Sequence, residues 1–163
     1  MIFITVGSQK FQFNRLLKAV DELVVERKIV DEIFAQIGAS DYKPQNYQFK
    51  DFLDRDEFLS WIDKADIVIT HGGTGTIIGA LKKGKKVIAV PRLSKYGEHV
   101  NDHQVQLMDQ LKTLDLICNL NDCSELEYGL KFVKEHEFNI YESDSEKIIE
   151  SIEEYINREI FFE

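Results

Sequence analysis

Four glycines and two threonines fall within the short run HGGTGTIIG, from His71 to Gly79. The run comes directly after the apolar segment Asp66–Thr70, which predicts a buried strand, and it overlaps Thr74–Lys83, which predicts a helix. At such a junction the first N–H groups of the helix have no partner within it, and the helix dipole places positive charge there. Glycine lets an anion approach the backbone, and threonine hydroxyls add donors. The pattern therefore predicts an anion site, preferably for a diphosphate.

The same glycines could serve other purposes, and their spacing separates these. The dinucleotide fingerprint GxGxxG does not fit, because Gly73 to Gly79 reads GxGxxxG and no acidic residue ends a strand about 20 residues later. A Walker loop does not fit Gly79–Lys86, since the Ser or Thr that contacts magnesium is missing. A turn that needs glycine only for its conformation remains an alternative, although one glycine would be enough for it. An anion cradle is therefore favoured.

The histidines and cysteines give weaker signals. His99 and His103 are spaced to share one helix face, next to Glu98, but there is no HExxH pattern and no third ligand at a fixed spacing. No metal site is therefore expected. Cys118 and Cys123 do not form a CxxC motif, so a reduced cytosolic chain is the simpler interpretation.

Composition narrows the class of protein further. The chain has 163 residues, 44% hydrophobic and 30% charged, which is typical of one globular domain with its own core. Its net charge is −9 without a basic stripe, so nucleic-acid binding is not expected. No apolar run approaches the ~18 residues of a membrane span, and the start of the chain has no signal-peptide pattern. We therefore expect a cytoplasmic protein.

Short apolar runs alternate with segments of helical periodicity along the chain. Strands are predicted at Ile2–Val6, Glu32–Ile37, Tyr47–Phe52, Asp66–Thr70, Lys86–Val90 and Leu116–Asn119. Helices are predicted over residues 14–26, from Asp54 through Ile62, and at Thr74–Lys83, Val100–Lys112 and Cys123–Glu135. This alternation predicts an α/β fold with a Rossmann-like, doubly wound parallel sheet. A single domain over residues 1–163 is expected, with a C-terminal amphipathic helix at about 142–163.

Ligands of doubly wound sheets bind beyond the carboxyl ends of the strands. In this chain the rule indicates Gly7 and Ser8 after the first strand, His71–Thr76 after the fourth, and the loop after Pro91. These three segments form the predicted ligand-binding edge.

The run THGGTGTIIGALKKGKKVIAVPRLSKYGEHVNDHQVQLMDQL resembles the donor-binding half of the MurG-like glycosyltransferases. It is most similar to their split members, the catalytic subunit of the dolichol-linked GlcNAc transferase and the PssE-type subunits of exopolysaccharide and capsule synthesis. The motifs that match are HGGxGT, GK, VPR and KYGEHVNDHQ, in that order, and the opening IFITVGSQKFQFNRL is also similar. The resemblance covers nearly all of residues 1–120 and implies half of a GT-B fold.

The resemblance implies the catalytic, donor-binding subunit of a two-component inverting glycosyltransferase. Such an enzyme would transfer a hexose, galactose or GlcNAc, from a UDP-sugar to a polyprenyl-diphosphate-linked sugar in exopolysaccharide or capsule biosynthesis. A membrane-anchored, acceptor-binding partner subunit would hold the chain at the inner face of the membrane. No cofactor is expected, because the UDP-sugar is the donor substrate. Alternatives are a UDP-sugar-binding regulatory module without catalysis, and the GlcNAc transferase subunit of N-glycan precursor assembly.

The resemblance also assigns site residues. It places the diphosphate on the glycine loop, the sugar and ribose beside the GEHVNDHQ motif, and the uracil near Arg92. Glu98 and His99, with His71 as a third choice, are the local candidates for the base that takes the acceptor's proton. The expected donor-binding residues are Gly7, Ser8, His71, Gly72, Gly73, Thr74, Gly75, Thr76, Arg92, Glu98, His99, Asn101 and Gln104.

One position departs from the MurG pattern. In MurG a glutamate on the helix after the glycine loop holds the ribose, and Gly79 stands at that position here. Glycine has no side chain for this role, so either Glu98 or Gln104 substitutes or the ribose is held differently.

The end of the chain is strongly acidic and amphipathic. From Lys134 to Glu163 the net charge is −7, while Ile152, Ile156 and Ile160 fall on one helical face. This helix either packs on the domain's own sheet or, as we hypothesise, docks the partner subunit in part.

Overall fold

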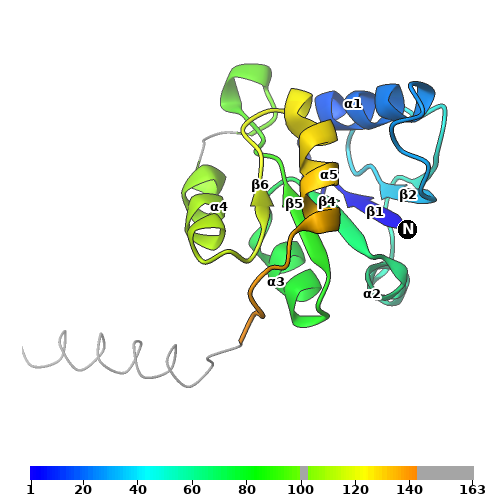
Figure 1. Cartoon of the computed structure of the whole chain (residues 1–163). Helices are drawn as coiled ribbons and strands as arrows, with labels where there is room; N and C mark the ends of the chain where they lie inside the picture. Colours follow the sequence, from blue (N-terminus) through cyan, green and yellow to red (C-terminus); the bar gives the residue numbers. More distant parts are fainter. Residues whose placement is uncertain (100–102, 143–163) are drawn as a thin grey trace, which may run out of the picture.

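A computed structural model describes residues 1–99 and 103–142 of the chain. Within them six strands form one sheet, in the order β3-β2-β1-β4-β5-β6, with helices on both faces (Figure 1). All neighbouring strands are parallel. The strands are β1 (Ile2–Thr5), β2 (Ile33–Gln36), β3 (Gln48–Lys50), β4 (Ile67–Thr70), β5 (Lys86–Ala89) and β6 (Cys118–Asn119). The predicted Rossmann-like, doubly wound α/β fold is confirmed.

Two apolar layers hold the helices against the sheet. The helices are α1 (Asn14–Val25), α2 (Arg55–Lys64), α3 (Thr74–Lys82), α4 (His103–Thr113) and α5 (Leu126–Glu135). One buried cluster contains side chains of α1 and α5, and the other contains side chains of α2, α3 and α4. The central strands are buried on both sides, which explains their continuous apolar runs.

The order of the strands reverses between β1 and β4. Successive strands run outward from β1 through β2 to β3, and then from β4 through β5 to β6. In folds of this kind a nucleotide usually binds beside the loops that leave the two central strands. Thr5 and Thr70, the last residues of β1 and β4, pair directly in register. The glycine loop therefore begins at the topological switch point of the sheet.

Several local signals in the sequence are confirmed by the backbone. The Asp54 side chain accepts a hydrogen bond from the Glu57 N–H and caps α2. Gly84 has a φ of +66°, so α3 stops at the expected left-handed glycine. Cys118 and Cys123 are buried free thiols.

One predicted helix differs from the observed structure, and one short turn was not predicted. The segment predicted as one helix, Cys123–Glu135, is a 3-10 turn, η2 (Cys123–Glu125), followed by α5. Asp122 causes the break, because its side chain accepts the Ser124 N–H and caps the tight turn first. A second turn, η1 (Ser94–Tyr96), lies in the loop after β5 and was not predicted; Gly97, with a φ of +68°, closes it.

The C-terminal prediction stays open. The amphipathic helix expected at about 142–163 falls almost wholly on residues 143–163, which lie outside the described part of the chain. Among the described residues, no helix is both long enough and apolar enough to cross a bilayer.

Candidate functional site

The N-terminus of α3 offers unused hydrogen-bond donors at the switch point. Gly73 is the N-cap residue, and no side chain caps the helix, whereas α2 has Asp54 in that role. Thr74 and Gly75, the first two helical residues, are exposed. The first N–H groups of a helix have no intrahelical acceptor, so this uncapped end is suited to an anion.

The glycines of the loop are needed for different reasons. Gly72 has a φ of +85°, which a side chain rarely adopts. A Cβ at Gly73 would overlap the His71 ring, at 2.8 Å from its Nε2. At Gly75 and Gly79, by contrast, a Cβ would meet no heavy atom within 4 Å. The protein's own packing therefore explains Gly72 and Gly73, but it does not explain why Gly75 lacks a side chain.

His71 is buried between the loops that follow β1 and β4. Its side chain is 6% exposed, and its Nδ1 lies 3.4 Å from the Thr70 hydroxyl oxygen. Burial, reinforced by the nearby Arg92 charge, lowers the pKa of His71 to about 4, although a hydrogen bond to the Thr5 backbone acts in the opposite direction. The imidazole is therefore neutral near pH 7.

Arg92 lies beneath the loop that follows β1. Its side chain is 0% exposed, and its Nη2 donates to the carbonyl oxygens of Val6, at 2.6 Å, and Phe11, at 2.9 Å. Its Nε and Nη1 have no hydrogen-bond partner among the described residues. Burial lowers the pKa of Arg92 to about 10, against a raising effect of Glu98. In this structure the guanidinium thus fastens the β1 loop and does not reach a surface where it could border the uracil.

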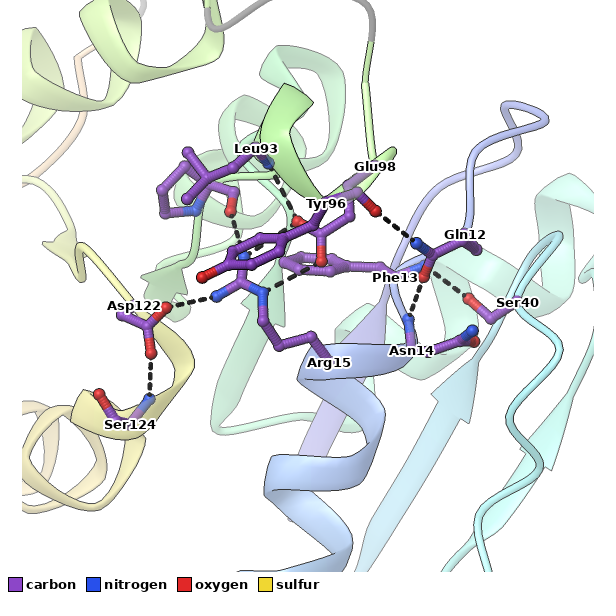
Figure 2. A network of polar contacts seen from close by, with 11 residues as sticks. Gln12, Phe13, Asn14, Arg15, Ser40, Leu93, Tyr96, Glu98, Asp122 and Ser124 are labelled. Atoms are coloured by element: carbon purple, nitrogen blue, oxygen red, sulfur yellow. Dashed lines mark hydrogen bonds and ion pairs between the residues drawn. The ribbon is translucent and has the colours of Figure 1, made fainter.

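Glu98 forms an ion pair that the sequence did not reveal. Its carboxylate is 1% exposed and accepts two hydrogen bonds from Arg15 of α1, both at 3.0 Å, and a third from the Leu93 N–H. Arg15 also donates to Asp122 and to the Pro91 carbonyl. Figure 2 shows the guanidinium at the centre of this network, beside the Tyr96 ring.

This network favours a structural role for Glu98 over the expected role of catalytic base. A base must reach the acceptor hydroxyl with a free lone pair. The Glu98 carboxylate is buried, and its oxygens are held by Arg15 and Leu93. Of the other two local candidates, His71 is only 6% exposed, and His99 is partly buried with its ring 5.1 Å from that of Phe11.

Some of the remaining expected site residues lie in the described part of the chain, and others do not. Gly7 follows β1 with a φ of +78°, and Ser8 beside it is exposed. Asn101 and the side chain of Gln104 lie outside the described part of the chain. The structure therefore brings the loops after β1, β4 and β5 together at one edge of the sheet, as expected.

A surface cavity of about 530 Å³ lies beside α1, on the face of the sheet away from α3. Gln12, Arg15, Lys18, Tyr96 and Ser124 are among its lining residues, and the glycine loop is not. In the described part of the chain, no group of three or more His, Cys, Asp or Glu side chains is arranged to hold a metal ion.

Comparison with known proteins identifies the family. The model of the glycosyltransferase family 28 C-terminal domain matches residues 1–158 of the chain. The chain belongs to this family. The expected likeness to MurG-type GT-B glycosyltransferases is thereby confirmed.

Curated relatives of this family 28 domain are much longer proteins. The human UDP-N-acetylglucosamine transferase subunit ALG13 is 32% identical over 117 residues, which are 68% of this chain and 10% of that protein. The mouse protein of the same name is 28% identical over 116 residues. The chain therefore spans about a tenth of the length of these relatives.

Solved structures support the fold of the family 28 domain. A glycosyltransferase of kitacinnamycin superposes with a TM-score of 0.64 at 18% identity, over 83% of this chain and 35% of that one. MurG of Acinetobacter baumannii superposes with a TM-score of 0.55 at 17% identity, over 82% of this chain and 41% of that one. The chain thus corresponds to part of a larger GT-B fold.

The Glu98–Arg15 ion pair gives a prediction about stability. Glu98→Gln keeps the size of the side chain but leaves Arg15 without its buried counter-charge, so we expect the free energy of unfolding to fall by about 2 kcal/mol in urea titrations. Asp122→Asn, which changes the exposed partner of the same arginine, should cost less than about 1 kcal/mol. If Glu98→Gln left stability unchanged and abolished sugar transfer, Glu98 would be the base after all.

Proposed function

We propose that this family 28 domain is the catalytic, donor-binding subunit of a two-component inverting glycosyltransferase. It takes a hexose, GlcNAc or galactose, from a UDP-sugar and transfers it to a polyprenyl-diphosphate-linked sugar. The observation that carries the proposal is the uncapped, exposed N-terminus of α3 at the switch point of a family 28 domain. The name of the human relative, a UDP-N-acetylglucosamine transferase subunit, supports UDP-GlcNAc as donor and a subunit as the form of the protein.

The diphosphate of the donor would lie on the first turn of α3. There the N–H groups of Thr74, Gly75 and Thr76 face it, and the threonine hydroxyls add donors. As the bond to the sugar breaks, negative charge grows on the departing UDP, and fixed donors that point at this charge lower the barrier. Gly75 has open space where its Cβ would be, which suits a close approach of the phosphate oxygens.

The ribose contact and the catalytic base are each assigned to a single residue. Because Arg15 occupies the Glu98 carboxylate, Gln104 is the better substitute for the ribose-holding glutamate that Gly79 cannot provide. His99, at the same edge, is the local candidate for the base that deprotonates the acceptor hydroxyl. A base supplied by the partner subunit is the alternative.

The partner of this subunit would bind the acceptor. The chain covers 32 to 41% of six solved glycosyltransferases that it resembles, so the acceptor-binding domain would belong to another polypeptide or to another part of a longer one. A membrane-anchored partner would bring the chain to the inner face of the membrane, where lipid-linked sugars are found. Exopolysaccharide or capsule synthesis is the biological setting that we propose, with N-glycan precursor assembly as the alternative.

A pair of glycine substitutions tests donor binding. Gly75→Ala places a methyl group where the diphosphate would lie, so we expect UDP affinity, measured by isothermal titration calorimetry, to fall at least about tenfold, while helix stability is kept or improved. Gly79→Ala is the matched control for the diphosphate contact, because its methyl group is equally unhindered but lies one turn further along α3, at the position of the ribose-holding glutamate of MurG. It should change the affinity for inorganic pyrophosphate, which has no ribose, less than about threefold, whereas Gly75→Ala should lower it. Unchanged UDP affinity in Gly75→Ala would refute the cradle.

A transfer assay tests the reaction. The chain, with and without a co-expressed membrane-anchored partner, is incubated with radiolabelled UDP-GlcNAc or UDP-galactose and membranes that contain lipid-linked sugars. We expect label in the lipid fraction only when the partner is present. Tight binding of UDP-sugars without transfer to lipid under either condition would favour the regulatory module, and binding of NAD but no UDP compound would exclude both.

A further inference from the structure

The imidazole of His71 lies between the loop after β1 and the turn before α3. A Cβ at Gly7, in the loop after β1, would lie 2.7 Å from the ring's Cε1. A Cβ at Gly73, in the turn before α3, would lie 2.8 Å from Nε2 and 2.9 Å from Cε1. Real Cβ atoms essentially never approach so closely. One edge of the ring therefore occupies the place that side chains of both loops would need.

The ring is also held at the end of the sheet, through Nδ1, the atom next to Cε1. Nδ1 lies 3.4 Å from the Thr70 hydroxyl, and a hydrogen bond joins the ring to the Thr5 backbone. Thr5 and Thr70 are paired neighbours at the ends of β1 and β4. The ring is thus held at the ends of the two central strands, and it limits how closely the two loops can approach each other.

We propose that His71 is a positioning residue, a spacer whose ring sets the separation between the β1 loop and the N-terminus of α3, and thereby the width of the diphosphate cradle. The proposal rests on the proposed function for what the cradle holds. It accounts for the glycine at position 73 by contact with His71, and at position 7 this contact adds to a φ of +78°, which itself favours glycine. It does not require the imidazole to touch the ligand, and the ring is almost wholly buried.

The charge state of the ring agrees with a spacer. Burial and the Arg92 charge hold the pKa of His71 at about 4, so the imidazole carries no positive charge near pH 7. Attraction between a charged histidine and the diphosphate is thus not available. What the ring supplies is its shape and its contact with the strand ends.

A double-mutant cycle between His71 and Gly73 tests the proposal. Gly73 has a φ of −68°, so alanine fits its backbone and the methyl group conflicts only with the ring. In the native background we expect Gly73→Ala to lower the thermal unfolding midpoint and to weaken UDP binding at least tenfold. In a His71→Ala background, which itself binds UDP more weakly, the added Gly73→Ala should change the affinity less than threefold, because the ring is gone.

Gly75→Ala is the matched control for this cycle. It lies two residues away and its methyl group meets no atom of the protein, so its effect on UDP affinity should be the same in both backgrounds. His71→Asn, which keeps a polar group beside the strand ends but lacks the far edge of the ring, replaces His71→Ala if that variant does not fold. Folding of each variant is checked by circular dichroism before titration.

The outcomes separate the spacer from other roles of His71. Coupling between the two substitutions in UDP affinity, beyond that of the control, supports the proposal. Coupling in the unfolding midpoint alone, with no coupling in the affinity of folded variants, shows a purely structural contact and overturns it, as does an equal effect of Gly73→Ala in both backgrounds. If the native chain binds no UDP, the proposed function fails, and the midpoints measured without ligand then decide whether the ring separates the loops.

Discussion

Two arginines cross between the loops after β1 and β5, and the arrangement of the whole functional edge depends on them. Arg92, from the β5 loop, binds two carbonyl groups of the β1 loop, and Arg15, from the helix that follows the β1 loop, binds Glu98 and the Pro91 carbonyl of the β5 loop. Each loop is thus held by a cation from the opposite segment. The planar guanidinium suits this role, because it offers several donors in fixed directions, which lysine does not. Arg92 is buried beside few counter-charges, which carries a desolvation cost. Its hydrogen bonds to the β1 loop must offset this cost.

These contacts do not involve the backbone N–H groups at the N-terminus of α3, which remain without a side-chain acceptor. The carbonyls of the β1 loop and the carboxylate of the β5 loop are used within the protein, whereas the N-terminus of α3 has no side-chain cap. An anion that binds there meets groups already held in place, so little ordering is needed at the moment of binding. His71 connects the two regions, since the same edge of its ring lies against both the β1 loop and the turn before α3. Under the proposed function, the loops around the switch point are thus held in place before the diphosphate binds.

The sequence predicted the fold well because its signals are local. Apolar runs, the Asp54 cap and the Gly84 stop depend on residues close together in the chain, and the glycine loop after β4 could be placed at a strand end for the same reason. The roles of Arg92 and Glu98 could not be predicted in this way. Their partners are 81 to 86 and 83 residues away, so no local spacing records the contacts. Arg15 was missed for the same reason, because on an amphipathic helix it resembles any solvated charge.

The most direct test of the account is a titration of the isotopically labelled chain with UDP, followed by ¹H–¹⁵N correlation spectra. We predict that the amide signals of Gly72–Thr76 shift the most and saturate together at one UDP per chain, since their N–H groups bind the diphosphate. The signals of Asn14 and Ser124, which line the cavity beside α1, should move little. Shifts confined to that cavity, with the glycine-loop amides unchanged, would contradict a donor site at the N-terminus of α3.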